Sequence, residues 1–393
     1  MPKVSEAAAA VPGSGILEIF HMIAGRDGIL HLEIGQPDFP TPSHIIEAAA
    51  TSARAGSGYC DRAGILSLRS VIQEKLARVN GIDVDADQVI ITQGGVQGCS
   101  AVLSAVVRPG DEVLIPDPGW PNFEMLVRLQ GASPVYYSLD PTNDWLPEPT
   151  EVESLISNRT ALIIMNSPAN PTGALFPDPL VDRFIEIAQR HDVTLLSDEV
   201  YDELIYDGGK PANAFSRGGE HVVSVYSFSK TYSMTGWRVG YLVAPDWLAP
   251  TLSRIQETVV SCISTVTQAA GEAAITGPQD AVTMMSDTYR RRRDRAIEIL
   301  AAEGFEVPPP AAGFFLMVPL AEGADSKQGA LNLIDQGVAL SPGTAYSYTA
   351  TNYLRISLAS SDHAIEHGVA RVAKWLKATD RGMTTVPAGS IVS

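Results

Sequence analysis

Residues 227–241 read SFSKTYSMTGWRVGY, which places Lys230 among hydroxyls and glycines and Arg238 eight residues further on. The apolar run His221–Tyr226 just before this stretch has the length and composition of a buried strand. Lys230 is therefore expected just past the carboxyl end of a strand, where α/β folds place their binding and catalytic groups. The stretch predicts an α/β fold with a functional site at this strand end.

The side chains of this stretch suit a phosphorylated aldehyde cofactor. Ser227 and Ser229 are short hydroxyl donors, and the planar guanidinium of Arg238 fits a phosphate group. A lysine that is partly desolvated and close to fixed positive charge has a lowered pKa, so its neutral amine can form an imine. Lys230 in this setting indicates pyridoxal phosphate, although the stretch alone also fits a polar surface loop with an incidental lysine.

Upstream of this stretch, expected strands alternate with expected helices. The strands are Val89–Thr92, Glu112–Ile115, Ser133–Ser138, Ala161–Met165, Val193–Leu196 and Val222–Tyr226. The helices between them are Gln97–Val107, Pro121–Leu129, Glu151–Ser157 and Leu180–Arg190. This alternation predicts a mostly parallel central sheet with helices on both faces, and Val239–Val243 is a candidate for one more strand of antiparallel direction.

The two ends of the chain are expected to build a smaller α+β domain. The expected elements there are a helix over Ser14–Ile23 and strands over Leu30–Ile34, Phe314–Val318 and Tyr353–Leu358, with helices over Ala330–Gln336 and Ile365–Trp375. The predicted division is residues 1–45 for an N-terminal arm and part of the small domain, 46–285 for the large cofactor-binding domain, 286–379 for the small C-terminal domain and 380–393 for a flexible tail.

Two further helices are expected before the first strand of the sheet. Thr41 followed by Pro42 is typical of a helix start, with the threonine as cap, and the helix continues over Ser43–Ser52. A second helix is expected over Ala63–Asn80. The one basic run, Arg290–Arg293, falls in an expected long helix and covers every face of it, so we expect solvated or salt-bridged structural arginines.

The composition narrows the functional classes. The chain has 393 residues, 45% of them hydrophobic, which is enough for a large core. Its formal net charge of −17 opposes binding to nucleic acid and to anionic membranes. No apolar stretch is long enough to span a bilayer, and residues 1–15 contain no sustained apolar segment typical of a signal peptide. We therefore expect a cytoplasmic protein with no nucleic-acid or membrane partner.

The cysteines point to neither a disulfide framework nor a metal site. Cys60, Cys99 and Cys262 are widely separated, and no CxxC pair occurs. We expect three reduced structural thiols and no bound metal.

Glycines and an acidic group stand at other expected strand ends. Gly94-Gly95-Val96 joins a strand to a helix, and its glycines would let backbone N–H groups approach a phosphate, although such turns also occur without a ligand. Asp198 follows another strand, and a carboxylate buried there needs a cationic partner. A protonated pyridine nitrogen would supply that partner, and the pair would keep the ring an electron sink.

Three more positions carry a weaker signal. Trp120, within Pro-Gly-Trp-Pro, on its own predicts a packing tryptophan. Asn170 lies in Asn-Pro-Thr-Gly, which on its own predicts a tight turn. Arg355 lies mid-strand between apolar neighbours and needs an anion, which is either a substrate carboxylate bound by its fork of donors or the partner in a structural salt bridge.

Taken together, these motifs resemble the class I/II aminotransferases, the aspartate-aminotransferase-like group of fold-type I pyridoxal-phosphate enzymes. The similarity runs from about Ser14 to Trp375, with the Asn-Pro-Thr-Gly, Asp-x-x-Tyr and Ser-x-Ser-Lys motifs and the following arginine in the family's order. The resemblance implies a fold-type I α/β architecture, pyridoxal 5′-phosphate as cofactor, and a homodimer with shared active sites. It also implies ping-pong transfer of an amino group between an amino acid and a 2-oxo acid.

The resemblance assigns roles to single residues. Lys230 would hold the cofactor as a Schiff base and act as general acid and base. The residues at the phosphate would be Gly94, Gly95, Val96, Ser227, Ser229 and Arg238, with Tyr59 reaching the phosphate in the partner subunit. The residues at the ring would be Asp198 at its nitrogen, Asn170 and Tyr201 at its phenolic oxygen, and Trp120 stacked on its face. The residues at the substrate would be Gly35, Trp120, Asn170 and Arg355.

One departure from the family concerns the substrate. Many relatives that act on acidic substrates carry lysine where Val96 stands, and the sequence assigns no second arginine to a distal carboxylate. The amino donor and the acceptor therefore stay open.

Other functions remain open at this point. A β-eliminating C–S lyase on the same fold would share the carbanion chemistry. A ligand-sensing aminotransferase-like module, as found fused to DNA-binding domains, is opposed by the acidic charge. A plain nucleotide-binding protein is weaker still, because neither a P-loop nor a full GxGxxG is present.

Overall fold

The computed structural model describes residues 3–383 and divides into two compact units. The large unit holds the N-terminal residues up to Pro12, the segment Gln36–Asp287 and the short segment Ala311–Gly313. The small unit holds Gly13–Gly35, Thr288–Pro310 and the chain from Phe314 onward. The ranges predicted for the arm and the small domain, 1–45 and 286–379, also include residues 36–45, 286–287 and 311–313, which lie in the large unit. The predicted tail lies, from residue 384 on, outside the described residues.

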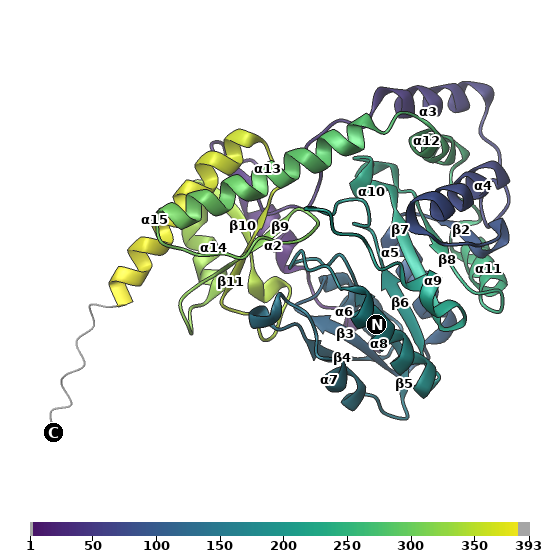
Figure 1. Cartoon of the computed structure of the whole chain (residues 1–393), viewed down its shortest axis with the longest axis horizontal. Coiled ribbons are helices and arrows are strands. Elements are labelled where there is room, and N and C mark those ends of the chain that lie inside the picture. The colour runs from purple at the N-terminus through teal and green to yellow at the C-terminus, as the bar shows by residue number, and fades with distance from the viewer. Residues whose placement is uncertain (1–2, 384–393) are drawn as a thin grey trace. The chain divides into compact units, whose positions relative to one another are not determined.

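The large unit is built on a mostly parallel sheet, as predicted (Figure 1). Its strands are β2 Val89–Thr92, β3 Glu112–Asp117, β4 Ser133–Ser138, β5 Thr160–Asn166, β6 Thr194–Asp198, β7 Val222–Ser227 and β8 Gly240–Val243. Their order is β2-β8-β7-β6-β5-β3-β4. Strand β8 runs antiparallel to both β2 and β7, whereas the other pairs are parallel. The antiparallel direction predicted for the last strand is confirmed.

Strands β2, β5, β6 and β7 are mostly apolar because both faces of the sheet are covered there. Successive side chains point to opposite faces, so that Ile163 belongs to one buried cluster and Ile164 to the other. The helices of the large unit are α1 Glu6–Ala9, α3 Ser43–Ala55, α4 Leu66–Lys75, α5 Gly95–Val106, α6 Pro121–Leu129, α7 Pro149–Ser154, α8 Asp178–His191, α9 Ala214–Gly218, α10 Phe228–Thr231, α11 Ala249–Val260 and α12 Thr265–Thr276. Helices α3, α4, α8, α9 and α12 share the first cluster, and α5, α6 and α11 share the second.

The start of α3 corrects one prediction. The residue before the helix is Pro42, and no side chain caps the first turn. Thr41 instead donates its hydroxyl to the carbonyl of Ser233 at 2.7 Å and accepts the indole N–H of Trp237 at 3.0 Å. The hydroxyl of Thr41 points to these partners and not to the first turn of α3, so Thr41 ties its segment to the chain that follows Lys230.

The helix expected over Ala63–Asn80 is shorter than predicted. Helix α4 begins at Leu66, and the chain passes into a π-helical turn over Leu76–Asn80. Gly64, just before the helix, has φ +106°, and a Cβ there would lie 2.2 Å from the side chain of Ile91. The chain therefore turns at this glycine before the helix can start.

The small unit is α+β. Its sheet has the order β1-β10-β11-β9, with strands β1 Leu30–Leu32, β9 Phe315–Pro319, β10 Val338–Pro342 and β11 Tyr353–Ser357. Its helices are α2 Gly15–Ile23, α14 Ser326–Asp335, α15 Asp362–Met383 and the part of α13 Asp280–Ala302 from Thr288 onward. Strand β10, which the sequence analysis missed, pairs in parallel with β1 and antiparallel with β11.

The basic run lies in α13 and is structural, as predicted. Arg292 and Arg293 are each 5% exposed. Arg292 donates to Asp362 at 2.7 Å, and Arg293 donates to the carbonyl of Pro310 at 3.0 Å. Within residues 3–383, no helix is both long and apolar enough to cross a membrane.

Candidate active site

Three neighbouring strands end together at one edge of the large sheet. The register pairs Asn166 of β5 with Asp198 of β6, and Asp198 with Val225 of β7. Lys230 lies in the short helix α10, which begins directly after β7. The carboxyl ends of parallel strands are the usual position for a site in such a sheet, and this edge holds Asp198 and Lys230 close enough for their charges to interact.

A glycine turn lies beside Arg238 at the same edge. Gly94 has φ +79°, and a Cβ there would lie 2.7 Å from Nη2 of Arg238. Arg238 donates from Nη1 to the carbonyl of Thr235 at 2.7 Å, which fixes the guanidinium next to the turn. Helix α5 begins at Gly95, so its unpaired N–H groups and Arg238 form one region suited to an anion.

The two serines of the lysine stretch lie against this turn. The hydroxyl of Ser227 accepts the backbone N–H of Ser229 at 3.2 Å. A Cβ on Gly95 would lie 3.8 Å from Cβ of Ser227. The structure therefore brings together five of the predicted phosphate residues: Gly94, Gly95, Ser227, Ser229 and Arg238. The sixth, Val96, is half-buried and packs against a core cluster.

Asp198 is a buried carboxylate in need of positive charge. Its side chain is 3% exposed, and Oδ1 accepts the N–H of Val200 at 3.3 Å. Burial, with a smaller contribution from the charge of Glu199, raises the pKa of Asp198 to about 7. The bond from Val200 and the charge of Lys230 oppose that rise but do not cancel it.

The ring-side candidates are fixed by local contacts. The N–H of Asn170 donates to Oδ1 of Asn166 at 2.8 Å, and Asn166 donates to the carbonyl of Asp198 at 3.1 Å. Asn166, which the sequence analysis did not single out, thus links the Asn-Pro-Thr-Gly turn to the Asp198 segment. Tyr201 is buried. Trp120 precedes α6 and packs edge-to-face on Phe123, with ring centroids 5.4 Å apart.

Gly35 and Arg355 lie together in the small unit. Arg355 is 1% exposed and lies against two rings, with Cζ 4.1 Å from the centroid of Phe315 and 4.6 Å from that of Tyr346. Its Nη2 donates to the carbonyl of Glu33 at 2.5 Å. A Cβ on Gly35 would lie 2.6 Å from the Phe315 ring. Phe315 and Tyr346 thus fix the orientation of the Arg355 guanidinium plane. No sequence pattern indicated this role for either residue.

Tyr59 lines a groove that no residue of the lysine stretch lines. Its side chain is 92% exposed. It lines a groove of about 480 Å³ together with Cys60, Asp61, Arg62, Glu257, Ser261 and Cys262. Among the described residues, no group of three or more His, Cys, Asp or Glu side chains is arranged to hold a metal ion.

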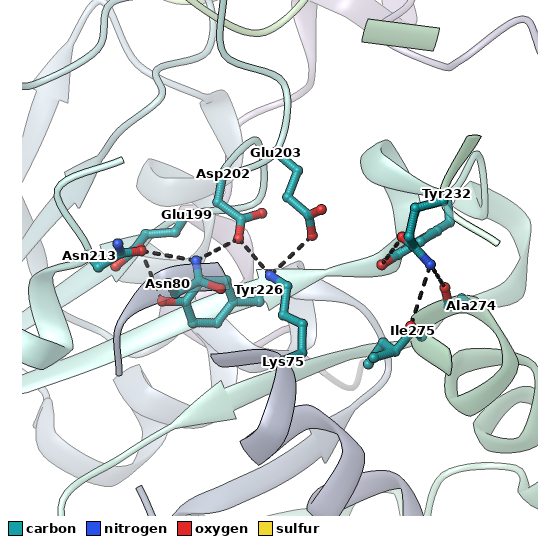
Figure 2. A network of polar contacts seen from close by, with 11 residues as sticks. Lys75, Asn80, Glu199, Asp202, Glu203, Asn213, Tyr226, Tyr232, Ala274 and Ile275 are labelled. Carbon is teal, nitrogen blue, oxygen red and sulfur yellow. Dashed lines mark hydrogen bonds and ion pairs between the residues drawn. The ribbon is translucent and has the colours of Figure 1, made fainter. Parts of the chain in front are cut away.

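A buried ionic network lies beneath the lysine stretch (Figure 2). Nζ of Lys75 lies 2.9 Å from Asp202 and 3.1 Å from Glu203, and 5.7 Å from the ring centroid of Tyr226, which precedes Ser227. Asn80 also donates to Asp202, at 3.0 Å. The carboxylates raise the pKa of Lys75 well above its ordinary value although burial opposes this, so the lysine is charged.

The sequence analysis missed Lys75, but a signal was present. Lys75 follows Ile72 by three residues and Leu68 by seven, so it lies on the apolar face of its helix. A lysine on a buried face needs carboxylate partners.

Glu199 anchors the segment that carries Asp198. It is 2% exposed and accepts hydrogen bonds from Ser224 at 2.8 Å, Tyr226 at 3.0 Å and the N–H of Ala214 at 3.3 Å. These bonds satisfy a buried carboxylate and fix the backbone directly after Asp198; Figure 2 shows Glu199 beside Tyr226.

Comparison with known proteins identifies the family to which this chain is similar. The sequence profile of aminotransferase class I and II matches residues 27–372. The aspartate/prephenate aminotransferase of Thermus thermophilus is 34% identical over 363 residues, which cover 89% of this chain and 92% of that protein. The aromatic-amino-acid aminotransferase 2 of Thermococcus litoralis is 34% identical, with coverage of 95% and 98%. The solved structure of Thermus thermophilus aspartate aminotransferase with maleate has a TM-score of 0.91 at 32% identity and covers 96% of this chain and 100% of its own.

These matches bear on two predictions. The similarity to a solved aspartate aminotransferase over nearly the whole chain confirms the predicted fold class. The relatives are named as aminotransferases, which favours amino transfer over the β-eliminating lyase that the sequence left open.

Proposed function

Because the chain belongs to the class I and II aminotransferases and is an enzyme of that kind, we propose that it uses pyridoxal 5′-phosphate held by Lys230 to move an amino group between an amino acid and a 2-oxo acid. The observation that carries the proposal is the buried Asp198 near Lys230 at the ends of β6 and β7. A carboxylate with 3% exposure calls for a permanent cationic partner. The protonated pyridine nitrogen of the cofactor is such a cation.

The residues present fit this cofactor. The lack of a side chain at Gly94 leaves room beside Arg238 that a Cβ would fill, and the start of α5 presents backbone N–H groups there. Ser227 and Ser229 add hydroxyls next to this position. Asp198 would then supply the carboxylate that the ring nitrogen needs, and Lys230 would supply the amine that the aldehyde needs.

The cofactor, when bound, withdraws electrons from the substrate Cα and so acidifies its proton. Lys230 would hold the cofactor aldehyde through Nζ, and its free amine would take the proton from the substrate Cα as a general base and return it as a general acid. Asp198 would keep the ring nitrogen protonated. Asn170 and Tyr201 would donate to the phenolic oxygen, and the Trp120 indole would cover the ring face.

Substrate binding is assigned to Arg355 and Gly35. Phe315 and Tyr346 hold the guanidinium of Arg355 flat, which leaves a planar fork suited to an α-carboxylate.

Arg355→Lys is expected to lower kcat/KM about 10- to 100-fold, mainly through KM, for amino acid and 2-oxo acid alike. Lysine keeps the charge but loses the planar two-point contact and the stacking against the rings. Steady-state kinetics with two donors measures this. The matched control is Arg295→Lys, an exposed arginine of the same unit paired with Glu366 at 2.6 Å, which should leave both constants unchanged. An unaltered KM in a well-folded Arg355→Lys variant would contradict the assignment.

The charge of Asp198 should make the cofactor-free protein less stable as pH rises. Its folded pKa of about 7 lies above the ordinary 3.8, so between these values the unfolded chain has released a proton that the folded chain keeps. The free energy of unfolding then falls by about 1.4 kcal/mol per pH unit over that window and levels off above it. Urea unfolding from pH 4.5 to 8 should show this loss in the wild type and not in Asp198→Asn. Equal pH profiles for the two proteins would show that Asp198 is already compensated.

We further propose a cytoplasmic homodimer in which Tyr59 reaches the phosphate in the partner subunit. An aromatic side chain with 92% exposure, beside a groove, is typical of an interface residue. Free thiols at Cys60, Cys99 and Cys262 fit a reducing compartment. Tyr59→Phe should weaken cofactor retention without loss of the dimer.

The absorption spectrum of the purified protein tests the cofactor and the reaction. A visible band that converts to the amine form of the cofactor when a single amino acid is added, with no acceptor present, is the expected result, and its extent ranks the donors. A band that persists while pyruvate and ammonia accumulate would establish elimination instead. Absence of a band after addition of pyridoxal phosphate would overturn the proposal.

A further inference from the structure

Two of the three cysteines meet in the large unit although 202 residues separate them. The backbone N–H of Cys60 donates to Sγ of Cys262 at 3.4 Å. Sγ of Cys60 in turn accepts Nε2 of Gln268 at 3.2 Å and lies 3.7 Å from the carbonyl of Ile263, the residue after Cys262. Both sulfurs therefore lie in the same small space between two loops.

The ionisation of Cys60 also reflects its surroundings. Burial raises the pKa of the Cys60 thiol, and the neighbouring Cys262 raises it further, against the hydrogen bond from Gln268. The contacts of Cys60 with Sγ of Cys262 and with the carbonyl of Ile263 make the two sulfurs neighbours. The separation in sequence, which argued against a disulfide framework, does not keep these two apart in the fold.

In the single chain, both thiols border open space. Cys60 and Cys262 are half-buried and line the groove of about 480 Å³ that also holds Tyr59. Neither lies in a regular element: Cys60 stands between α3 and α4, and Cys262 between α11 and α12. Cys99 differs in both respects, since it is fully buried within α5. Two loops can adjust to a new bond more readily than two packed helices can.

We propose that Cys60 and Cys262 form a reversible redox site that closes to an intramolecular disulfide when it meets a small disulfide oxidant. The thiolate of one cysteine attacks the S–S bond of the oxidant, forms a mixed disulfide and releases one small thiol. The thiolate of the other cysteine attacks the protein sulfur of that mixed disulfide and releases the second small thiol. The protein loses two protons and two electrons, and the oxidant gains them.

The disulfide would restrain the segment that carries Tyr59. It links Cys60, the residue after Tyr59, to the turn at Ser261, whose φ of +62° is rare for a residue other than glycine. Hydrogen exchange of residues 56–65 should therefore slow on oxidation. A consequence for cofactor binding would rest on the proposed function of Tyr59, but formation of the bond does not.

Thiol counting on the cofactor-loaded enzyme tests the proposal. The enzyme is incubated with oxidised glutathione at pH 8, blocked with N-ethylmaleimide, denatured and digested. The expected result is loss of two of the three thiols, a linked peptide that contains Cys60 and Cys262, and full recovery with dithiothreitol. The reaction should accelerate from pH 7 to pH 9, because the thiolate is the nucleophile.

Single variants separate this site from unspecific oxidation. In Cys60→Ser and in Cys262→Ser, the remaining thiol has no neighbour and should end as a glutathione mixed disulfide. Cys99→Ala should form the same linked peptide as the wild type. Stable mixed disulfides on both cysteines of the wild type, a covalent dimer through either of them, or no loss of thiols would each overturn the proposal. These outcomes are read from peptide masses, so failure of the aminotransferase assignment would not be mistaken for failure of the thiol pair.

Discussion

Replacement of Lys230 by alanine is expected to lower kcat for amino transfer by at least about 10⁴-fold, to background. The variant loses the amine that holds the cofactor and the base that takes the Cα proton, and general acid–base catalysis alone contributes about 10²- to 10⁴-fold. The same half-reaction assay with a single amino acid measures the loss. Lys230→Arg should be equally inactive, since arginine does not lose its proton at working pH.

A control separates catalysis from folding in this experiment. Lys210→Ala removes an exposed lysine of the same unit and should retain full activity. Both variants should keep the wild-type circular dichroism spectrum, because neither residue lies in the core clusters. Near-normal turnover by Lys230→Ala would exclude Lys230 as the catalytic amine.

Lys75→Met is expected to lower the free energy of unfolding by about 3–5 kcal/mol. The side chains of Lys75 and Asp202 are 6% and 5% exposed, so loss of the lysine strands Asp202 and Glu203 as buried charges without a cation. Urea unfolding followed by tryptophan fluorescence measures the effect. Four of the five tryptophans, Trp120, Trp145, Trp237 and Trp247, lie in the large unit, so the signal reports mainly on the unit that holds the network.

Two comparisons test the reason for the Lys75 effect. Lys327→Met breaks an exposed pair with Glu18 at 2.9 Å and should cost about 0–1 kcal/mol. The triple variant Lys75→Met, Asp202→Asn, Glu203→Gln removes the stranded charges and should recover much of the loss. If Lys75→Met cost no more than Lys327→Met, water or a local rearrangement would be compensating the two carboxylates.

The central sheet could be predicted because each strand carries its own signal. Val222–Ser227 and Thr160–Asn166 are apolar runs ended by polar turn residues, and burial on both faces requires that pattern. Helix α12 could not be predicted in this way. Its sequence, TVTQAAGEAAIT, is alanine-rich with a central glycine, and Gly271 lies against the ring of Phe228. Close packing, not an amphipathic stripe, holds this helix in place.

Some residues of the candidate site could be predicted from the sequence itself, and others only from the family resemblance. The lysine stretch pointed to its chemistry by itself, and the structure places Gly94 and Arg238 side by side as that chemistry needs. The roles of Trp120, Asn170 and Tyr59 came only from the family resemblance and stay predictions. The meeting of Cys60 with Cys262 could not be read from the sequence, because nothing local encodes a contact across 202 residues.

The antiparallel strand β8 determines which mutations the site can tolerate. The chain leaves the sheet after Ser227, passes through Lys230 and Arg238, and returns at Gly240, which pairs with Ser227. A Cβ on Gly240 would lie 2.7 Å from the carbonyl of Tyr226 and 3.1 Å from Cα of Gly94, so the point of return is fixed on both sides. The segment from Ser227 to Gly240 is therefore a loop whose two ends are fixed and whose length cannot change. Single substitutions within it change its chemistry, whereas adding or removing one residue would misplace the lysine and the arginine at once.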